Sequence, residues 1–318
     1  MPAFSVVIPL YNKADTIERT LRSIAQQTYH DFEVIIIDDG STDGSAEVVQ
    51  NLSLKIPLTL IKQKNSGVSV ARNKGAEVAH GKFLAFIDAD DEWMAEYLQG
   101  VFSAHRCYPA ARVIGTDYEA VYPDKIVSGR DKNIIEMVDF FKEWPIRSPI
   151  HTSSLCIDRS FFLSIGGFKR GCRFFEDAEL LFRLAQADGM FAVNRRVLAR
   201  YNCDAVERAT GRGIPMLEYP HLLWAEKMLE DNNVLSAGLL KCLRSLFLRA
   251  YLANSRRLLV RGNKDLARRY PHICDDMILR LLTSYIISVI TLPINLALAV
   301  YFRWLYFRRT KCIKKNAF

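Results

Sequence analysis

The sequence predicts an α/β protein with a mostly parallel sheet and helices on both faces. Short apolar segments alternate with amphipathic ones from the start of the chain to about residue 213. Residues 83–87, FLAFI, are five apolar residues in succession. Such a run indicates a strand that is buried on both faces, as strands of a parallel sheet are. Alternation of strands and helices through short loops is typical of this fold class.

The expected elements follow one another in a regular order. Apolar runs predict the strands, helical spacing of apolar residues predicts the helices, and Ser41, Thr42 and Asp43 are candidate helix caps. The expected strands are 4–9, 32–37, 58–61, 83–87, 112–116, 153–157 and 193–201, with a hairpin or irregular excursion over 118–127. The expected helices are 17–25, one that follows residue 43, 68–79, 94–108, 134–142 and 176–187.

Charge divides the chain into two parts. Residues 1–214 carry 26 Lys and Arg and 28 Asp and Glu, a net of −2, whereas residues 215–318 carry 17 and 7, a net of +10. The alternation of strands and helices also stops near residue 213. We therefore expect an α/β domain over 1–213 and a basic helical region over 214–318, where acidic partners would be met.

Cysteine usage points to a reducing compartment. The seven cysteines are scattered, their number is odd, and no two are separated by only two residues. This pattern argues against a disulfide framework or a zinc site and favours reduced thiols in a cytosol-facing protein. The N-terminal residues enter a strand pattern without a basic stretch and a long apolar run, so we expect no secretory signal.

Three acidic clusters end or follow predicted sheet elements. They are Asp38-Asp39, Asp88-Ala89-Asp90 and Glu176-Asp177. Ligands of open α/β sheets bind at the carboxyl ends of the strands, and Mg²⁺ or Mn²⁺ on a diphosphate needs one or two carboxylates there. The competing interpretation is that Asp88 and Asp90 only end the strand and cap the next helix, a role that Asp91 also suits.

Two further residues fit a metal-bound nucleotide diphosphate. Arg72 lies on the helix after the turn at residues 65–67 and could face the diphosphate; otherwise it is a solvated surface residue. Asp39 could accept a hydrogen bond from a base or a ribose hydroxyl; otherwise it is a turn residue.

Five segments in order resemble the family-2 glycosyltransferases of the GT-A fold. Each segment alone is weak, because Asp-x-Asp occurs by chance, but the five together in this order and spacing are specific. They cover roughly residues 3–205 and leave the last hundred residues outside the resemblance. The segments are 6–12 (VVIPLYN), 37–43 (IDDGSTD), 67–73 (GVSVARN), 86–91 (FIDADD) and 175–180 (FEDAEL).

The resemblance implies an inverting transfer of a sugar from a nucleotide diphosphate, usually with Mg²⁺ or Mn²⁺. By motif position, Asp39 would contact the base, commonly uracil, and Asp88 would meet the ribose. Asp90 would bind the metal, Asp177 would be the general base, and Glu176 would lie beside it near the acceptor. The remaining donor-binding positions are Pro9, Tyr11 and Asn12, which would line the nucleoside pocket, and Arg72, near the nucleotide.

These residue types suit the implied chemistry. Direct displacement at the anomeric carbon needs a base for the proton of the acceptor hydroxyl and positive charge on the departing diphosphate. A carboxylate on one side and a metal on the other divide these tasks. The alternative for Glu176 and Asp177 is an acidic first turn that stabilises its own helix dipole.

The chain also departs from parts of the superfamily. Processive polysaccharide synthases carry a Gln-x-x-Arg-Trp motif after the base, and the corresponding region here reads YNCD at 201–204. We therefore expect a single-addition enzyme. His151 begins a segment, 151–154 (HTSS), that stands where family members often build part of the sugar pocket, although a lone histidine there is more often structural.

The C-terminal region contains a long apolar segment. Leu281–Phe302 is 22 residues without a formal charge, is interrupted by Pro293 and is bounded by Arg280 and Arg303. That length suffices to cross a bilayer, but Lys and Arg on both flanks fit a re-entrant or interfacial anchor better than one plain crossing. A pair of soluble core helices is the third possibility. Nucleic-acid binding is disfavoured because the basic residues adjoin long apolar runs.

We therefore expect a glycosyltransferase that adds one sugar, with a UDP-sugar favoured as donor. The expected acceptor is a lipid-linked or growing glycan in bacterial surface-polysaccharide assembly, at the cytoplasmic face of the plasma membrane. The nearest alternative is a polyprenyl-phosphate sugar synthase, whose phosphate acceptor needs no general base. A nucleotidyltransferase is disfavoured by the absence of a Gly-rich basic loop after the first strand, and a non-catalytic binding module by the presence of both metal-type and base-type acids.

Overall fold

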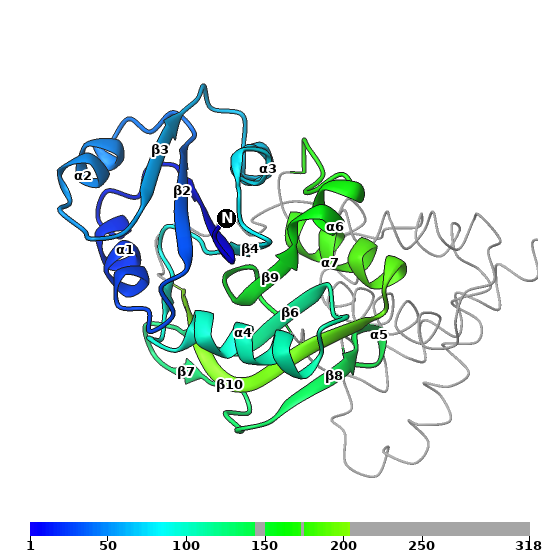
Figure 1. The fold of residues 1–318 in the computed structure, drawn as a ribbon. Helices are drawn as coiled ribbons and strands as arrows, with labels where there is room; N and C mark the ends of the chain where they lie inside the picture. The colour runs from blue at the N-terminus through cyan, green and yellow to red at the C-terminus, as the bar shows by residue number, and fades with distance from the viewer. Residues whose placement is uncertain (144–149, 173–174, 204–318) are drawn as a thin grey trace, which may run out of the picture. The chain divides into compact units, whose positions relative to one another are not determined.

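A computed structural model of the protein describes residues 1–143, 150–172 and 175–203. These residues form one mixed sheet with helices on both faces (Figure 1). The expected boundary at residue 213 and the apolar segment 281–302 lie outside the described residues. Within the described part of the chain, no helix combines the length and apolar character needed to cross a bilayer.

The sheet has the strand order β3-β2-β1-β4-β9-β6-β10-β5, with β7 paired to β6 and β8 paired to β10. Its strands are β1 (Phe4–Leu10), β2 (Phe32–Asp38), β3 (Leu58–Lys62), β4 (Phe83–Phe86), β5 (Glu92–Trp93), β6 (Val113–Val121), β7 (Ile126–Val127), β8 (Ile135–Asp139), β9 (Leu155–Asp158) and β10 (Met190–Asn202). The helices are α1 (Ile17–Ala25), α2 (Ser45–Asn51), α3 (Val68–Val78), α4 (Tyr97–Cys107), α5 (Phe140–Glu143), α6 (Arg159–Ser164), α7 (Glu176–Ala187) and the 3₁₀ turn η1 (Thr152–Ser154).

The sheet is mixed, and the prediction of a mostly parallel sheet missed this. Parallel pairing joins β1 to β2 and β4, β2 to β3, and β6 to β10. Strand β9 lies between β4 and β6 and runs against both, so that β4 and β6 still point the same way. The short strands β5, β7 and β8 are also antiparallel to their neighbours.

Strand direction decides where the site can form. Strands β1, β2, β4, β6 and β10 all end at one edge of the sheet, and the antiparallel β9 begins there. The loops after β1, β2 and β4 therefore meet η1 and the end of β10 at this edge. This is the edge at which open α/β sheets bind ligands.

Alternate residues of the strands build the two faces. Val6 and Ile8 of β1 are fully buried in one cluster with Ile17 and Leu21 of α1 and Val101 of α4. The opposite face is covered by α3 and, beside it, α6. Figure 1 shows α1 and α2 on one side of strands β1–β3 and α3 on the other. The predicted coverage of both faces is confirmed.

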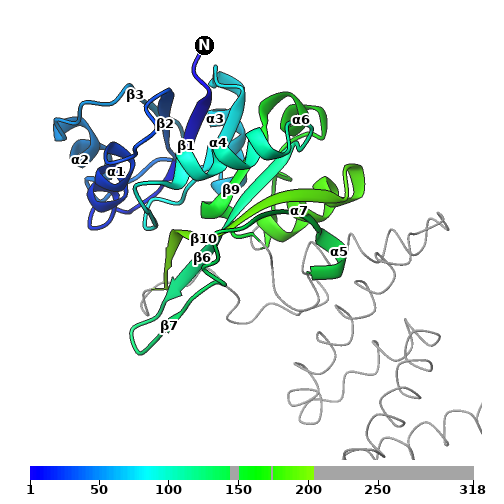
Figure 2. The ribbon, with the colours of Figure 1, turned by 60° about the horizontal axis from the view of Figure 1, so that its bottom comes forward.

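One predicted element is wrong in type. Residues 134–142 were expected to form a helix, but 135–139 form strand β8, and only the four residues of α5 are helical. The pattern IEMVD allows either structure, and pairing with five residues of β10 decides for the strand. The expected hairpin over 118–127 is present, because β7 pairs with the end of β6 and projects from the sheet (Figure 2).

Gly75 lets α3 approach the sheet. A Cβ atom at this position would overlap Cγ1 of Val7 in β1 and would lie 3.5 Å from Cγ1 of Ile37 in β2. The glycine lies three residues after Arg72, about one helical turn away, so the close packing also sets the depth of that arginine.

We expect Gly75→Ala to destabilise the protein by about 1–3 kcal/mol, because the added methyl group overpacks the interface with Val7. An Ala in place of Gly in an exposed helix would instead stabilise it. The free energy of unfolding in urea measures the effect, and Lys74→Ala on the exposed face of α3 is the control. The explanation is contradicted if Gly75→Ala is as stable as the parent. It is also contradicted if the loss of stability caused by Gly75→Ala is no smaller in a protein that also carries Val7→Ala.

Candidate active site

The centre of the candidate site is a buried ion triad. The guanidinium of Arg72 donates from Nη2 to Oδ1 of Asp88 at 2.6 Å and from Nη1 to Oε1 of Glu176 at 2.8 Å. Arg72 is 3% exposed, and its guanidinium lies 5.0 Å from the centre of the Phe168 ring. One side chain of α3 therefore joins the loop after β4 to the first turn of α7.

The charges in this triad shift one another's pKa values. Burial opposes ionisation of Asp88, but the charge and hydrogen bond of Arg72 outweigh burial and lower the pKa of Asp88 below its ordinary value. For Glu176, burial dominates and raises the pKa in spite of Arg72, with Asp177 adding to the rise. Asp88 is thus held ionised, while the acidic turn of α7 binds protons more readily.

Asp177 occupies the first turn of α7 beside the triad. Its Oδ1 accepts a hydrogen bond from the amide of Ala178 at 2.7 Å. Burial raises the pKa of Asp177, and the charge of Asp88 raises it further. A raised pKa makes a carboxylate a better proton acceptor, as a general base requires. Phe175 precedes the turn with φ 57°, a left-handed conformation that is uncommon for a bulky residue.

The loop after β4 is held from one side by α1. The N-cap residue of this helix and two residues within it donate to consecutive carbonyl groups: Thr16 to Ala89 at 2.9 Å, Arg19 to Asp90 at 2.8 Å and Thr20 to Asp91 at 2.7 Å. The carboxylates of Asp88 and Asp90 are left 27% exposed. The loop backbone is therefore fixed while both acids remain accessible.

Asp91 does not cap a helix, so that interpretation is wrong. Helix α4 begins at Tyr97 with Glu96 as its N-cap residue, and Asp91 is completely buried. Its carboxylate accepts hydrogen bonds from the hydroxyl of Ser153 and from the amide of Asn202 at 2.9 Å. Asp91 instead ties the loop to η1 and to the end of β10.

His151 lies among aromatic side chains at the same edge of the sheet. Its ring centre is 5.4 Å from that of Tyr118 in β6 and 4.2 Å from that of Tyr201 in β10. Burial lowers the pKa of His151 to about 4, and Nδ1 accepts a hydrogen bond from the amide of Ser153. The histidine is therefore neutral at physiological pH and presents Nε2–H as a donor.

The residues predicted to line the nucleoside pocket lie at the end of β1 and on the loop after it, and this loop is hydrogen-bonded to the loop after β2. Asn12, with φ 51°, donates its amide to Oγ of Ser41 at 3.1 Å, and its Oδ1 accepts from the amide of Thr42 at 2.8 Å. Ser41 and Thr42 thus bind the loop after β1 instead of capping α2, whereas Asp43 accepts a hydrogen bond from the amide of Ser45. Tyr11 beside them is 48% exposed.

Asp39 is buried and its carboxylate is well satisfied. Oδ1 accepts from Nε2 of Gln63 at 2.7 Å and from the amide of Ser66 at 2.8 Å, and Oδ2 accepts from the amide of Gly67 at 2.8 Å. These bonds shape the turn that leads into α3. Contact of Asp39 with a base stays a prediction and would use the remaining lone pairs of the carboxylate.

The residues present fit a divalent cation held partly by substrate. Asp90 and Asp88 offer accessible oxygen ligands, the type that Mg²⁺ and Mn²⁺ prefer. The described residues contain no group of three His, Cys, Asp or Glu side chains that could hold a metal by themselves. Diphosphate oxygens and water would therefore have to complete the coordination, as is usual for Mg²⁺ with nucleotides.

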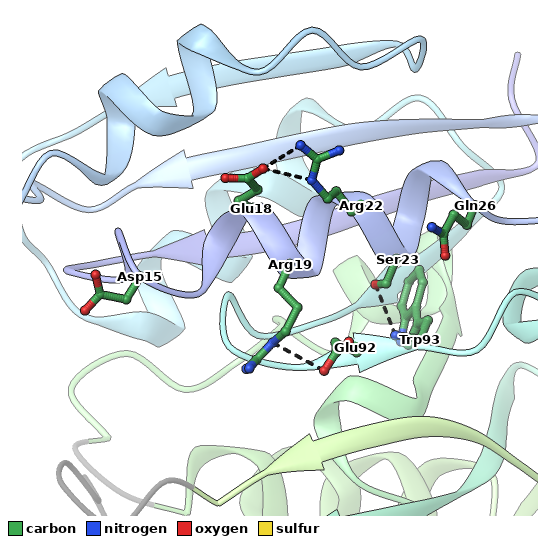
Figure 3. A pocket seen from close by; sticks show the side chains of 8 residues that line it. All are labelled: Asp15, Glu18, Arg19, Arg22, Ser23, Gln26, Glu92 and Trp93. Atoms are coloured by element: carbon green, nitrogen blue, oxygen red, sulfur yellow. Dashed lines mark hydrogen bonds and ion pairs between the residues drawn. The ribbon is translucent and has the colours of Figure 1, made fainter.

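A surface hollow of about 440 Å³ lies elsewhere, between α1 and β5 (Figure 3). It is lined mainly by polar side chains, among them the Arg19–Glu92 and Arg22–Glu18 pairs. It contains none of the predicted site residues.

The structure gathers most of the predicted residues and adds others that the sequence did not reveal. Asp88, Arg72 and Glu176 are in direct contact; Asp177 follows Glu176 in the chain, and Asp90 lies two residues after Asp88. Their chemical roles stay predictions. The added residues, Lys13, Tyr201 and Asn202, have no motif of their own, and only the three-dimensional pairing of β10 with the rest of the sheet brings the last two to the site, whereas Ser153 belongs to the segment 151–154 that the sequence had singled out.

Residues 5–158 match the family model described as Glycosyl transferase family 2. This part of the chain is a family-2 glycosyltransferase domain. The family and the transferase class predicted from the sequence are thereby confirmed for this domain.

Several curated relatives match about 90 to 100 residues of the chain. The chain is 51% identical over 89 residues to the uncharacterized glycosyltransferase YibD of Escherichia coli (strain K12), which covers 28% of this chain and 26% of the relative. It is 41% identical over 101 residues to the putative teichuronic acid biosynthesis glycosyltransferase TuaG of Bacillus subtilis (strain 168), 31% of this chain and 40% of the relative. For the amylovoran biosynthesis glycosyltransferase AmsB of Erwinia amylovora, the identity is 46% over 102 residues, 30% of this chain and 34% of the relative. The matches thus span between about a quarter and two fifths of these relatives' lengths.

A solved structure confirms the predicted GT-A fold. TarS of S. aureus (residues 1–349), in complex with UDP-GlcNAc, aligns with a TM-score of 0.68 at 19% identity, covering 86% of this chain and 80% of that chain. At this identity the likeness shows a shared fold.

We expect Arg72→Met to destabilise the protein by about 3 kcal/mol, because it removes a buried guanidinium and leaves the carboxylates of Asp88 and Glu176 without their partner. Unfolding in urea measures the loss, and adding Glu176→Gln should recover part of it. Arg22→Met, which breaks the exposed pair with Glu18, is the control and should cost no more than about 1 kcal/mol. An equally small loss of unfolding free energy in Arg72→Met would show that the triad does not hold the loop after β4 and the first turn of α7 together.

Proposed function

We propose that the protein is an inverting glycosyltransferase that moves one sugar from a nucleotide diphosphate sugar to a lipid-linked or glycan acceptor. The observation that carries this proposal is the contact of Arg72 with both Asp88 and Glu176. It brings the donor-side acids and the acidic first turn of α7 to one edge of the sheet, which is the arrangement that a single displacement needs.

The comparisons support the choice of substrates. The name of TuaG places that relative in teichuronic acid biosynthesis, and the name of AmsB places that one in amylovoran biosynthesis. The structures of TarS hold UDP-GlcNAc or UDP. We therefore favour a UDP-sugar as donor and a step of cell-surface polysaccharide assembly as the setting.

In the proposed reaction, Asp177 takes the proton of the acceptor hydroxyl as its oxygen attacks the anomeric carbon. Arg72 fixes the distance between Asp88, on the ribose side, and the turn that carries Asp177. Mg²⁺ or Mn²⁺ at Asp90 would neutralise the negative charge of the departing diphosphate. His151 and Tyr201 supply a neutral donor and an aromatic surface against which a sugar ring can pack.

We expect Asp177→Asn to lower turnover by about 10²–10⁴-fold and to leave UDP affinity nearly unchanged, because only the proton acceptor is lost. A panel of nucleotide sugars with Mn²⁺, scored for slow donor hydrolysis, first identifies the donor, and turnover and UDP binding are then compared. Equal loss of donor affinity would make Asp177 a binding residue. Full turnover would favour transfer to a lipid phosphate, and a silent panel would contradict the enzyme assignment.

We further propose that segment 281–302 attaches the protein to the cytoplasmic face of the bacterial plasma membrane. We expect the full-length protein to stay in the membrane pellet after carbonate extraction. Ile287→Asp, which places a charge within the segment, should shift protein to the supernatant. Ile126→Asp, on the exposed β7, is the control that should not. Release of the unaltered protein would exclude both a span and a deep re-entrant anchor.

A further inference from the structure

The main chain at Lys13 is fixed by hydrogen bonds on both sides. Its amide donates to Oγ of Ser45 at 2.7 Å, and its carbonyl accepts from the amides of Thr16 at 3.1 Å and Ile17 at 3.0 Å. The next residue is also held, since the amide of Ala14 donates to Asp43 at 2.9 Å. The main chain at Lys13 is thus anchored, and any displacement of its charge would have to come from rotation of the side chain.

The side chain of Lys13 lies against the acid that would hold a metal. Nζ of Lys13 is 2.8 Å from Oδ2 of Asp90, and the two side chains are 32% and 27% exposed. An ammonium ion thus stands beside the carboxylate that a divalent cation needs. Two cations on one carboxylate repel each other, so binding of the metal must displace Lys13 or be weakened by it.

Neither of the neighbouring arginines is equally suited to move. Arg72 is 3% exposed and holds two carboxylates at once. Arg19 binds the carbonyl of Asp90 and the carboxylate of Glu92 on the α1 side of the loop. Lys13 combines a fixed main chain with a flexible four-carbon stem and a compact charge, the form in which a lysine serves as a mobile phosphate ligand.

We propose that Lys13 is an exchangeable counter-ion that neutralises Asp90 before the donor binds and moves to the diphosphate oxygens when a divalent cation takes Asp90. This inference rests on the proposed function, because the cation and the diphosphate belong to that reaction. The exchange keeps the charge of Asp90 compensated in both states. It also makes metal binding favourable chiefly together with the nucleotide, whose diphosphate accepts the displaced ammonium.

The test uses the full-length protein in detergent and two binding measurements. The first is the dissociation constant of Mn²⁺ alone, from the electron paramagnetic resonance signal of the free ion. The second is the dissociation constant of UDP at saturating Mn²⁺, from calorimetry. The variants are Lys13→Met, Lys13→Gln and Lys13→Arg, and Lys142→Met, which breaks the surface pair with Asp139, is the control.

We expect Lys13→Met and Lys13→Gln to bind Mn²⁺ alone roughly three- to tenfold more tightly, because the competing cation is gone. The same variants should bind UDP in the presence of Mn²⁺ roughly tenfold more weakly, because one ligand of the diphosphate is lost. Lys13→Arg and Lys142→Met should retain the affinities of the parent. Opposite changes in the two constants are a result that general damage to the fold does not produce.

Unchanged constants, or weaker binding of Mn²⁺ alone, would overturn the inference while sugar transfer by the parent protein still supported the proposed function. Loss of folding in both Lys13→Met and Lys13→Gln, seen by circular dichroism, would also overturn it and make Lys13 a structural residue. Absence of Mn²⁺ binding by the parent protein, with and without UDP, would overturn both the exchange and the metal-assisted reaction.

Discussion

The contact of Arg72 with Asp88 and Glu176 is the interaction on which the rest of the site depends. Its three members come from α3, from the loop after β4 and from the start of α7, which are far apart in the sequence. Asn73, next to Arg72, forms two further hydrogen bonds from α3 to the main chain of Phe168: its Nδ2 donates to the carbonyl, and its Oδ1 accepts from the amide. One turn of α3 thus joins the loop after β4 to the loop before α7 and to the first turn of that helix.

A second constraint is the fixing of the loop that carries the acids. Helix α1 holds its carbonyl groups from one side, and Ser153 and Asn202 hold Asp91 from the other. This leaves few degrees of freedom to Asp88 and Asp90 other than their own side-chain rotations. A rigid loop of this kind keeps ligand atoms in place without a large ordering cost when substrate binds.

The sequence allowed the regular part of the fold and the main acids to be predicted, for physical reasons that differ from residue to residue. Buried strands such as 83–86 are continuous apolar runs, and α7 is bounded as expected because its periodicity is strong. Residues 135–139 have no clear period, so only pairing with β10 decides their structure. The reversed direction of β9 likewise arises from tertiary pairing.

The misassignment of Asp91 has the same origin. From the sequence it is one more acid between a strand and a helix, and such acids commonly cap helices. Its partners, Ser153 and Asn202, lie 62 and 111 residues further along the chain. Lys13 was overlooked because a lone lysine in a loop carries no pattern, and its role follows only from the position of Asp90.

The place of β9 in the sheet also bears on the order in which the domain can be made. Strands β1 to β4 pair among themselves, and their helices are local in the sequence, so this half can fold as soon as it leaves the ribosome. Strand β6, although made earlier than β9, cannot join that half until β9 inserts between β4 and β6. Glu176, which binds Arg72, and Ser153 and Asn202, which hold Asp91, are all made after this half, so Asp88 and Asp90 acquire their final surroundings only once β10 has been synthesised.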